Sequence, residues 1–410
     1  MKENGDLSLT LPINQTSDTV SARLTGSRLF LLAGLAALGS LATNIILPAF
    51  PQIGLDLGVS ARDMGLTLSS FFIAFALGQL FVGPLSDRFG RKSLVLGGLV
   101  IFVIGSAVCA LAGSLDVMIV GRVLQALGAC AASVLARAIA RDLYNGEELA
   151  RALALVMVAM AAAPGFSPLV GTMMESLLGW QMIFGFVAAF SIVLGVHYIV
   201  SVGETHNPDR RTALPLAAVL AAYGRLGIDL RFILPALAVS LVIGALYTFF
   251  ATAPSILISE IGLSGFQLAI FFAATVVIVF SAGFLSPRFA QRWGAAQTAF
   301  GGGIIALAGS AILLAFSGDP NLLSITFGLS IFLFGMGLIN PLGTAICLQP
   351  FPTQAGLASA LLGFLQMALA ALGSTLASTL PMAPTVSLAA ILTMATGLAA
   401  INPLDFVLDD

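Results

Sequence analysis

Long apolar runs alternate with short polar stretches along most of this chain. Twelve runs each hold about 20 mostly apolar residues, which at roughly 1.5 Å per residue is the length that a helix needs to cross a bilayer. Gly and Pro recur within the runs, as membrane helices tolerate, whereas a β-barrel would show short segments of alternating polarity. The pattern predicts twelve membrane-spanning helices, over residues 28–48, 65–85, 93–113, 117–140, 151–174, 180–201, 230–253, 265–286, 296–317, 322–346, 353–379 and 384–403.

The composition supports this interpretation. Hydrophobic residues occupy 59% of the 410 positions and charged residues 9%, far less charge than a soluble protein of this size needs on its surface. The predicted fold class is therefore all-α integral membrane. The three cysteines lie far apart in apolar runs, without the spacing of metal ligands, so we expect small buried hydrophobic side chains at Cys109, Cys130 and Cys347.

Lys and Arg are distributed unevenly between the two sides of the predicted membrane. If the N-terminus is cytoplasmic, fourteen of them fall on the cytoplasmic side, Arg62 alone falls on the other side, and Arg122 and Arg137 lie within the fourth helix. This bias follows the positive-inside rule, so both termini are expected in the cytoplasm. The first 27 residues are polar and lack the apolar core of a signal peptide, which favours a cytoplasmic tail.

The predicted helices divide into two halves of six. The long connection over 202–229 separates them, and its stretch PLAAVLAAYGRL is expected to form an amphipathic helix at the membrane surface. GPLSDRFGRK (83–92) follows the second helix and GFLSPRFAQRWG (283–294) follows the eighth, with five residues in register. Two such repeats are the layout of a two-bundle transporter. The expected domains are a tail over 1–27, a six-helix bundle over 28–201, a linker over 202–229, a second bundle over 230–403 and a tail over 404–410.

The connection over 83–92 carries a specific motif. Its spacing, Gly-x-Leu-x-Asp-Arg-x-Gly-Arg-Lys, resembles the signature loop of the major facilitator superfamily, and the resemblance extends over residues 28–403. It implies a gate in which Asp87 contacts the second bundle, and the expected partners are the N-terminal end of the eleventh helix and Arg141. The alternative is that Asp87 only balances the arginines of its own loop. The gating motif comprises Gly83, Asp87, Arg88, Gly90 and Arg91.

Two further stretches resemble motifs of the same superfamily. GRVLQALGACAAS (121–133), on the fourth helix, resembles its Arg-x-x-Gln motif, with Ala126 where a glycine is usual. APGFSPLVG (163–171), on the fifth helix, resembles its antiporter motif, which marks exporters that exchange substrate for protons. By themselves these small residues and prolines indicate close helix packing. The residues that match the antiporter motif are Pro164, Ser167, Pro168 and Gly171.

Three stretches resemble one subfamily more closely. ILPAFPQIGLDLGVS (46–60), ARDLY (140–144) and AGLASALLGFLQ (355–366) are similar to the bicyclomycin and chloramphenicol exporters, the Bcr/CflA group. The resemblance implies a multidrug efflux transporter of the bacterial inner membrane. The alternative is a facilitator or symporter of a metabolite or siderophore-like compound. No His/Asp/Glu cluster, nucleophile beside a base or phosphate-binding loop occurs in the sequence, so we expect no enzyme activity, cofactor or metal site.

One position departs from the family pattern and bears on proton coupling. Relatives commonly carry an acid in the first helix where this chain has Asn44, and asparagine does not titrate. No Asp or Glu lies deep in another predicted helix, although a proton-driven exporter normally needs a titratable group on its pathway. Either the substrate carries the proton, or coupling involves the nearest candidates, which are Arg122, Asp142 and Glu175.

Polar residues are spaced along the helices so that they could line a site near the bilayer midplane. Arg122 lies about 9 Å inside the fourth helix, where a charge costs roughly 2.5–3.5 kcal/mol, so it should face the cavity or a partner. The alternative is a structural role in binding carbonyls of the first helix. The candidate substrate-binding residues are Asn44, Gln79, Arg122, Gln125, Tyr247, Asn340 and Gln366.

The expected partners follow from this set of residues. An apolar cavity with several amides, one cation and no buried carboxylate suits small neutral, zwitterionic or weakly anionic amphiphiles. Besides this substrate, we expect protons and membrane lipids as partners. We expect no nucleic acid, and the protein should be a monomer.

Overall fold

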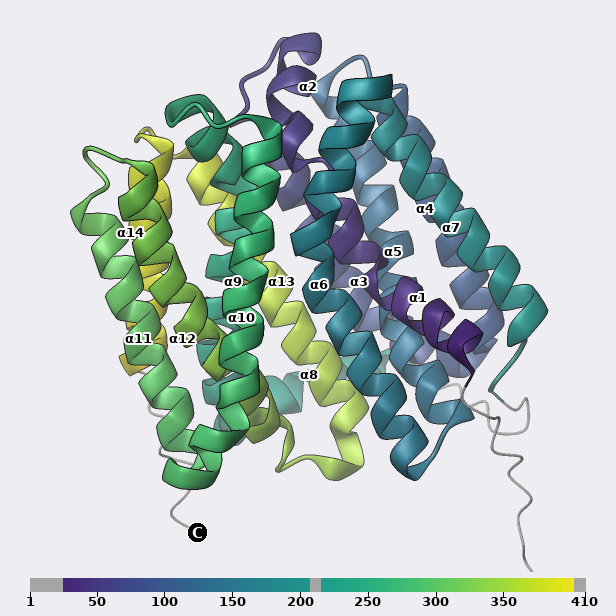
Figure 1. Cartoon of the computed structure of the whole chain (residues 1–410). Helices are drawn as coiled ribbons and strands as arrows, with labels where there is room; N and C mark the ends of the chain where they lie inside the picture. The colour runs from purple at the N-terminus through teal and green to yellow at the C-terminus, as the bar shows by residue number, and fades with distance from the viewer. Residues whose placement is uncertain (1–24, 207–214, 402–410) are drawn as a thin grey trace, which may run out of the picture.

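The structure is a computed structural model that describes residues 25–206 and 215–401. In this part of the chain, twelve helices are long and apolar enough to cross a membrane (Figure 1), which confirms the twelve predicted spans and the all-α membrane fold. They are α1 (Gly26–Asn44), α3 (Gly65–Phe89), α4 (Arg91–Ala110), α5 (Leu115–Leu143), α6 (Gly146–Leu178), α7 (Gln181–Ser201), α9 (Leu230–Ala253), α10 (Gly265–Trp293), α11 (Ala295–Ala315), α12 (Leu322–Leu348), α13 (Ala355–Thr379) and α14 (Pro384–Ile401).

Shorter helices extend or connect these spans. The 3₁₀ turn η1 (Leu47–Ala49) and α2 (Phe50–Leu57) continue α1, and the π-helix η3 (Pro254–Glu260) continues α9. The 3₁₀ turn η4 (Pro352–Gln354) precedes α13, and α8 (Leu216–Ile228) forms within the predicted linker. Residues 1–24 and 402–410, which hold most of the two predicted tails, and residues 207–214 of the linker lie outside the described part of the chain.

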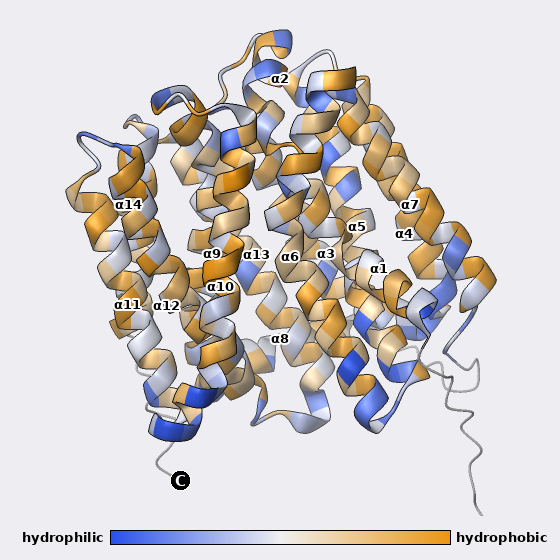
Figure 2. Ribbon diagram, in the orientation of Figure 1, coloured by the Kyte–Doolittle hydropathy of each residue, from blue (hydrophilic) through white to orange (hydrophobic). Residues whose placement is uncertain are grey.

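The spanning helices form two bundles, one of α1 and α3–α7 and the other of α9–α14 (Figure 1). Two helix pairs carry most of the contact between the bundles, α3 with α13 and α6 with α10. The lateral surface of both bundles is mostly hydrophobic, and the hydrophilic residues concentrate toward the two ends (Figure 2). This distribution is the one that a protein surrounded by lipid requires.

The signature motif is mostly helical. Gly83 to Phe89 form the last two turns of α3, and Gly90 alone separates α3 from α4, with φ 90° and ψ 156°. The sequence prediction of a loop here was wrong, because polar residues at the end of a membrane helix can continue the helix into the interface. Gly294 makes the same junction between α10 and α11, with φ 89° and ψ 154°, so the internal repeat extends to the backbone conformation.

Pairs of glycines provide a second sign of the repeat. In each bundle, two helices approach so closely that a Cβ on either glycine of a pair would meet the backbone or side chains of the facing helix. Small residues are what allows such backbone approach between membrane helices. The pairs are Gly98/Gly128 and Gly105/Gly121 between α4 and α5, and Gly302/Gly335 and Gly309/Gly328 between α11 and α12.

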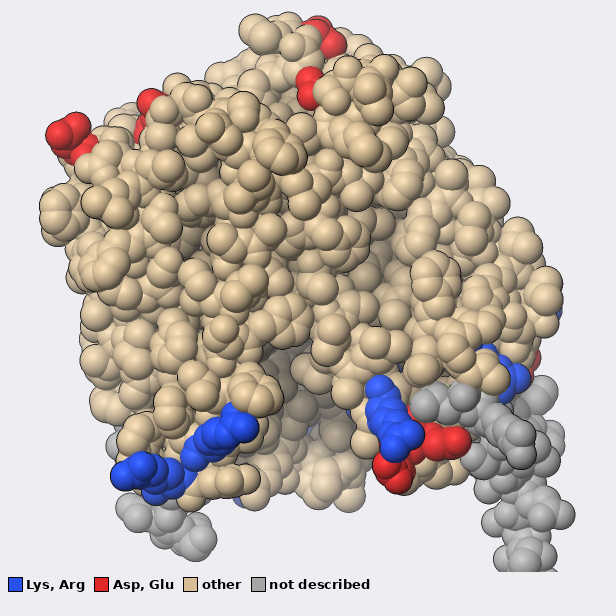
Figure 3. All heavy atoms as spheres, viewed as in Figure 1, with Lys and Arg blue, Asp and Glu red and all other residues tan. Residues whose placement is uncertain are grey.

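The two ends of the molecule differ in charge. Figure 3 shows Lys and Arg gathered at the end from which α1 starts, which we call the basic end, whereas acidic side chains dominate the opposite end. The same view shows a hollow between the two bundles at the basic end. The interior between the bundles is therefore approached from the basic end.

Candidate functional site

The two bundles are joined at the end opposite to the basic end, which we call the closed end. The hydroxyls of Ser69 on α3 and Ser374 on α13 lie 2.7 Å apart. The Thr172 hydroxyl on α6 donates to the carbonyl of Gly265 on α10 at 3.2 Å. Both helix pairs that connect the bundles are thus linked by hydrogen bonds near this end.

The gating motif lies at the basic end, beside the hollow. Asp87 accepts a hydrogen bond from Arg91 at 2.6 Å, and its side chain is 46% exposed. The Arg91 guanidinium also donates to Asp142 on α5 at 3.3 Å and to the Ser86 hydroxyl. In this structure Asp87 therefore makes the local pair that was the alternative interpretation. The described hydrogen bonds and ion pairs of Asp87 include neither Arg141, which lies on α5 of the same bundle, nor the start of α13, which lies across the hollow.

The start of the linker is attached to this motif. The Glu204 carboxylate accepts hydrogen bonds from the first two backbone N–H groups of α4, those of Arg91 at 2.9 Å and Lys92 at 3.4 Å. A carboxylate at a helix N-terminus is favourable because it satisfies free N–H groups and opposes the helix dipole. Thr205 donates to Asp142 at 3.0 Å. The sequence analysis missed Glu204, which lies more than a hundred residues from the helix that it caps.

Helix α8 packs under the second bundle and across to the first. Val219, Tyr223 and Leu226 form its buried face, against α9 and α13, so α8 is not only a surface helix as predicted. The Tyr223 hydroxyl donates to the Leu80 carbonyl of α3 at 3.0 Å. In a regular helix the Leu80 carbonyl would accept a hydrogen bond from the N–H of residue 84, but Pro84 has no N–H. The Tyr223 hydroxyl therefore replaces the missing donor. Burial raises the pKa of Tyr223 to about 12, so the phenol remains a hydrogen-bond donor well above neutral pH.

Arg122 is fully buried among α1, α3 and α5. Its Nη1 donates to the Ala42 carbonyl at 3.0 Å and to Gln125 Oε1 at 2.8 Å, and the guanidinium lies 4.6 Å from the centre of the Phe71 ring. Gln125 in turn donates to the Ser106 hydroxyl at 2.8 Å. The contact with Ala42 is the carbonyl-binding role that the sequence left open as an alternative.

The hydrogen bonding of Arg122 is incomplete. Within the described residues, its Nε and Nη2 have no hydrogen-bond partner, and neither has Oδ1 of the buried Asn44 two residues beyond Ala42. The ion pairs that the structure describes do not include Arg122. A guanidinium without a counter-charge in lipid is costly, which marks this position as a candidate for function.

Aromatic side chains connect the bundles between the closed end and the hollow. The Phe72 ring of α3 lies 5.1 Å from the Tyr247 ring of α9, edge to face, and Tyr247 contacts Phe250 at 5.8 Å. Phe250 continues to Phe272 of α10 at 5.4 Å. Of this cluster the sequence analysis selected only Tyr247, because the chain has 29 phenylalanines and nothing in their spacing distinguishes these.

The other predicted residues lie nearer to the basic end. Gln79 of α3 packs so closely on Gly363 of α13 that a Cβ there would overlap with its amide. Gln366 is half-buried one turn further along α13, and Asn340 is half-buried on α12 beside Pro341. The structure therefore divides the predicted residues into an Arg122 group, an aromatic group with Tyr247, and Gln79 with Gln366 on the facing helices α3 and α13, while Asn340 lies on a further helix, α12.

The residues that match the antiporter motif face two neighbouring helices. Gly171 of α6 contacts the Ile45 carbonyl at the end of α1, and Gly165 packs against Val276 of α10 in the other bundle. Ser167 and Pro168 are buried, and Pro164 is half-buried. Glu175 is half-buried near the closed end of α6. The motif thus lies where α6 meets both its own bundle and the second one.

We expect Gly171→Ala to destabilise the protein. The new Cβ would collide with a backbone carbonyl that cannot rotate away, and overpacking of this kind costs roughly 1–3 kcal/mol. The midpoint of thermal unfolding in detergent should fall. Gly97→Ala is the matched control, because a Cβ there meets nothing within 4 Å and alanine favours the helix. Equal midpoints for the two variants would contradict the packing argument.

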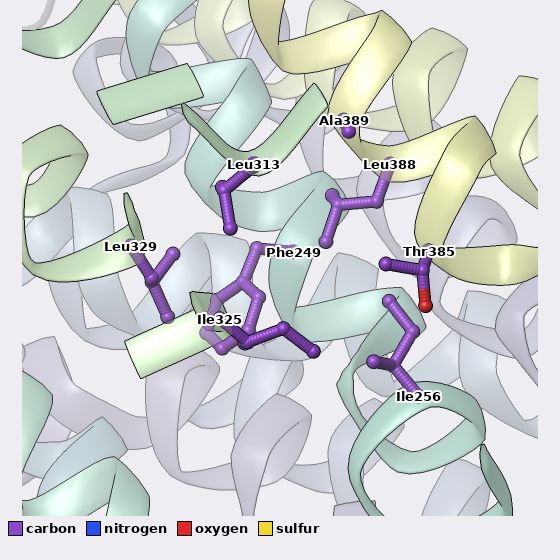
Figure 4. Close-up of a pocket in the computed structure, with 8 residues that line it drawn as sticks. All are labelled: Phe249, Ile256, Leu313, Ile325, Leu329, Thr385, Leu388 and Ala389. Carbon is purple, nitrogen blue, oxygen red and sulfur yellow. The ribbon is translucent and has the colours of Figure 1, made fainter. Parts of the chain in front are cut away.

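The second bundle also holds a small cavity away from the bundle interface (Figure 4). Its one polar lining side chain, Thr385, donates its hydroxyl to Glu260. A ligand site normally needs several convergent polar groups, so we do not assign the substrate to this cavity. The lining residues are Phe249, Ile256, Leu313, Ile325, Leu329, Thr385, Leu388 and Ala389.

Comparisons with known proteins agree with this architecture. The sequence profile of the family described as "Major Facilitator Superfamily" matches residues 32–374. Multidrug resistance protein D of Escherichia coli is 27% identical over 374 residues, which cover 89% of this chain and 92% of that protein. The chloramphenicol resistance protein of Pseudomonas aeruginosa is 31% identical over 319 residues, 77% of this chain and 74% of that protein. The crystal structure of the human organic anion transporter MFSD10 (TETRAN) aligns with a TM-score of 0.69 and 18% identity, covering 94% of this chain and all of that one.

Proposed function

The chain belongs to the major facilitator superfamily and is a multi-pass membrane transporter, and from this premise we propose that it exports small drug-like molecules by alternating access. The observation that carries the proposal is the asymmetry of the interface between the bundles, hydrogen-bonded at one end and hollow at the other. The names of the relatives support efflux as the direction of transport, and they are consistent with the Bcr/CflA group.

We propose that the basic end faces the cytoplasm of a bacterial inner membrane. The positive-inside rule supports this orientation, which puts both termini in the cytoplasm and makes the structure an inward-open state. An exporter in this state collects substrate from the cytoplasm. The two bundles, residues 28–201 and 230–403, would then rock about the central site to release the substrate outside.

The proposed substrate contacts combine aromatic rings with a few polar groups. Tyr247, which is half-buried and packs against Phe72 and Phe250, offers a ring to a flat apolar molecule. Gln366 and Asn340, which are also half-buried, offer amides. With Arg122 as the nearby cation, the site favours neutral, zwitterionic or weakly anionic amphiphiles over cations. In this proposal, the protein acts as a monomer and transports the substrate without changing it chemically.

Protons are the proposed driving force. Each charge moved across the membrane supplies about 2.3 kcal/mol per 100 mV, enough to drive a substantial gradient. Neither candidate carboxylate lies midway between the two ends. Asp142 is bound to Arg91 and Thr205 at the basic end, and Glu175 lies near the closed end. We propose that the substrate carries the proton or that Arg122 controls the ionisation of a group or water near it.

Asn44 favours a second candidate function. Its side-chain amide donates to the Ser40 carbonyl at 2.8 Å, in the fully buried place where the family resemblance leads us to expect an acid. Without a titrating group there, the protein could act as a facilitator or symporter of a metabolite or siderophore-like compound. The direction of transport separates the two functions, because an exporter lowers the amount of its substrate in the cell, whereas a facilitator equilibrates it and a symporter takes it up.

The test uses a bacterial host that lacks its own efflux pumps. With the chain expressed, we expect lower accumulation of phenicols, bicyclomycin or sulfonamides, and smaller effects on lipophilic cations. A protonophore should restore accumulation. Lower accumulation that persists with the protonophore would contradict proton coupling. Unchanged accumulation of every compound would contradict drug export.

A further inference from the structure

Arg62 is the one basic loop residue that the sequence places on the opposite side of the membrane from the other basic loop residues. It lies between α2 and α3 of the first bundle, at the closed end, and its side chain crosses to the second bundle. Nη1 donates to the Met382 carbonyl at 2.9 Å, and Nη2 donates to the Ala377 carbonyl at 2.9 Å and to the Leu380 carbonyl. Nε adds a bond to Ala377 at 3.2 Å.

The acceptors of Arg62 surround the C-terminal end of α13. The last carbonyls of a helix have no helical N–H partner and carry the negative end of the helix dipole, so a cation that donates several hydrogen bonds fits them. A guanidinium is suited to this role because its donors form a rigid planar fork. The position of Arg62 is also fixed locally, since Asp63 accepts hydrogen bonds from the backbone N–H of Ser60 at 3.1 Å and its hydroxyl at 2.6 Å.

The other polar contacts described between the bundles at this end are neutral. They are the Ser69–Ser374 hydroxyl pair and the Thr172–Gly265 bond. Hydrogen bonds from a charged donor are roughly twice as strong as neutral ones. Arg62, which makes four of them at the same helix end, is therefore the dominant polar contact across the described part of the closed end.

We propose that Arg62 is an outer latch, a positioning residue whose bonds to the end of α13 hold the transporter closed toward the outside. The latch must release α13 each time the outside opens, so its strength sets the ratio of outward-open to inward-open molecules. This inference rests on the proposed alternating-access function. It also explains why a chain that otherwise keeps its basic loop residues on one side retains this one on the other.

The test measures distances between spin labels in purified full-length protein without substrate. One label pair, at Leu55 and Leu323, reports on the closed end, where both side chains are exposed. A second pair, at Glu147 and Gln291, reports on the basic end, where both are exposed as well. In Arg62→Gln the outer pair should move apart and the inner pair should approach, with a roughly tenfold rise in the outward-open to inward-open ratio. Arg62→Lys, which keeps the charge, should recover part of the wild-type ratio.

Arg151→Gln is the matched control. It removes the same charge from an exposed side chain, whose described ion pair is with Glu147 four residues before it. Because a label at Glu147 would itself break that pair, the control and its wild type carry this label at the exposed Asn145 instead. Its distances should equal those of the wild type. Unchanged distances in Arg62→Gln, or equal shifts in Arg62→Gln and Arg62→Lys, would overturn the latch. Because no substrate is involved, the result stands even if drug export is disproved.

Discussion

Replacing Arg122 by methionine is expected to abolish most transport while leaving the protein as stable as before, or more stable. Two opposing effects of similar size act on stability. The substitution loses the charged hydrogen bonds to Ala42 and Gln125, worth roughly 1.5–3 kcal/mol each at most sites. It also removes a charge that costs roughly 2.5–3.5 kcal/mol in lipid and whose remaining nitrogens are unpartnered in the described structure. Apolar replacement of a buried charge is often neutral or stabilising for the same reason.

Transport should respond differently from stability. Arg122 is fully buried and binds the Ala42 carbonyl two residues before Asn44, and an ionisable group at this depth is a functional candidate by default. We expect the export rate of Arg122→Met to fall roughly tenfold or more, equivalent to about 1.4 kcal/mol of barrier height. The measurement compares export from vesicles with the midpoint of thermal unfolding of the same preparation.

Arg137→Met is the control for this experiment. Arg137 lies on the same helix α5, about four turns nearer to the basic end, and its loss should reduce export less. Full export by Arg122→Met would leave Arg122 only its structural contact with α1. A large loss of stability that parallels the loss of export would mean that the contact with Ala42 is its main role.

Replacing Asp87 by asparagine is expected to slow transport without unfolding the protein. In the inward-open state Asp87 makes one half-exposed pair with Arg91, which lies across the Gly90 junction at the start of α4, and exposed pairs contribute about 0.2–1 kcal/mol. When the inner side closes, we expect the Asp87 carboxylate to reach the N-terminal end of α13, where a negative charge is worth up to about 2 kcal/mol. Loss of that contact should reduce the export rate roughly five- to thirtyfold.

Glu147→Gln provides the matched control for Asp87→Asn. Glu147 also pairs with an arginine four residues away at the basic end, at 2.7 Å, but that pair is well exposed. Its removal should leave export unchanged. Wild-type export by Asp87→Asn would exclude Asp87 from gating and leave it only the local charge balance seen in this structure.

The fold was predictable because each spanning helix depends on the hydropathy of its own stretch of sequence. A spanning helix needs a long apolar run whatever its neighbours are, so hydropathy alone predicts all twelve spans. The ends were less predictable, because polar residues such as Asp87 continue α3 until Gly90 ends it. The repeat was visible in sequence through the two related motifs, whereas the paired glycines of α4 with α5 and of α11 with α12 required the structure.

The candidate site was predictable only in part. Depth in the membrane selected Arg122, and its contact with Ala42 was among the two roles considered. The partner of Asp87 depends on which side of the transporter is open, and a sequence does not encode one conformational state. Glu204 and Phe72 contact residues far away in the chain, so neither has a local signal. Arg62 was noticed as an exception to the charge bias, but its target, a row of backbone carbonyls, has no side-chain signature.

Proton-coupled export is the central claim, and the most direct test measures protons and substrate together. Purified protein is reconstituted into vesicles that contain a pH indicator, and a compound whose accumulation the chain lowers in cells is added. The account predicts that adding substrate on one side moves protons in the opposite direction, and that an imposed pH gradient drives the substrate uphill. Substrate movement that only equilibrates, with no change of internal pH at any gradient, would contradict antiport and establish a facilitator.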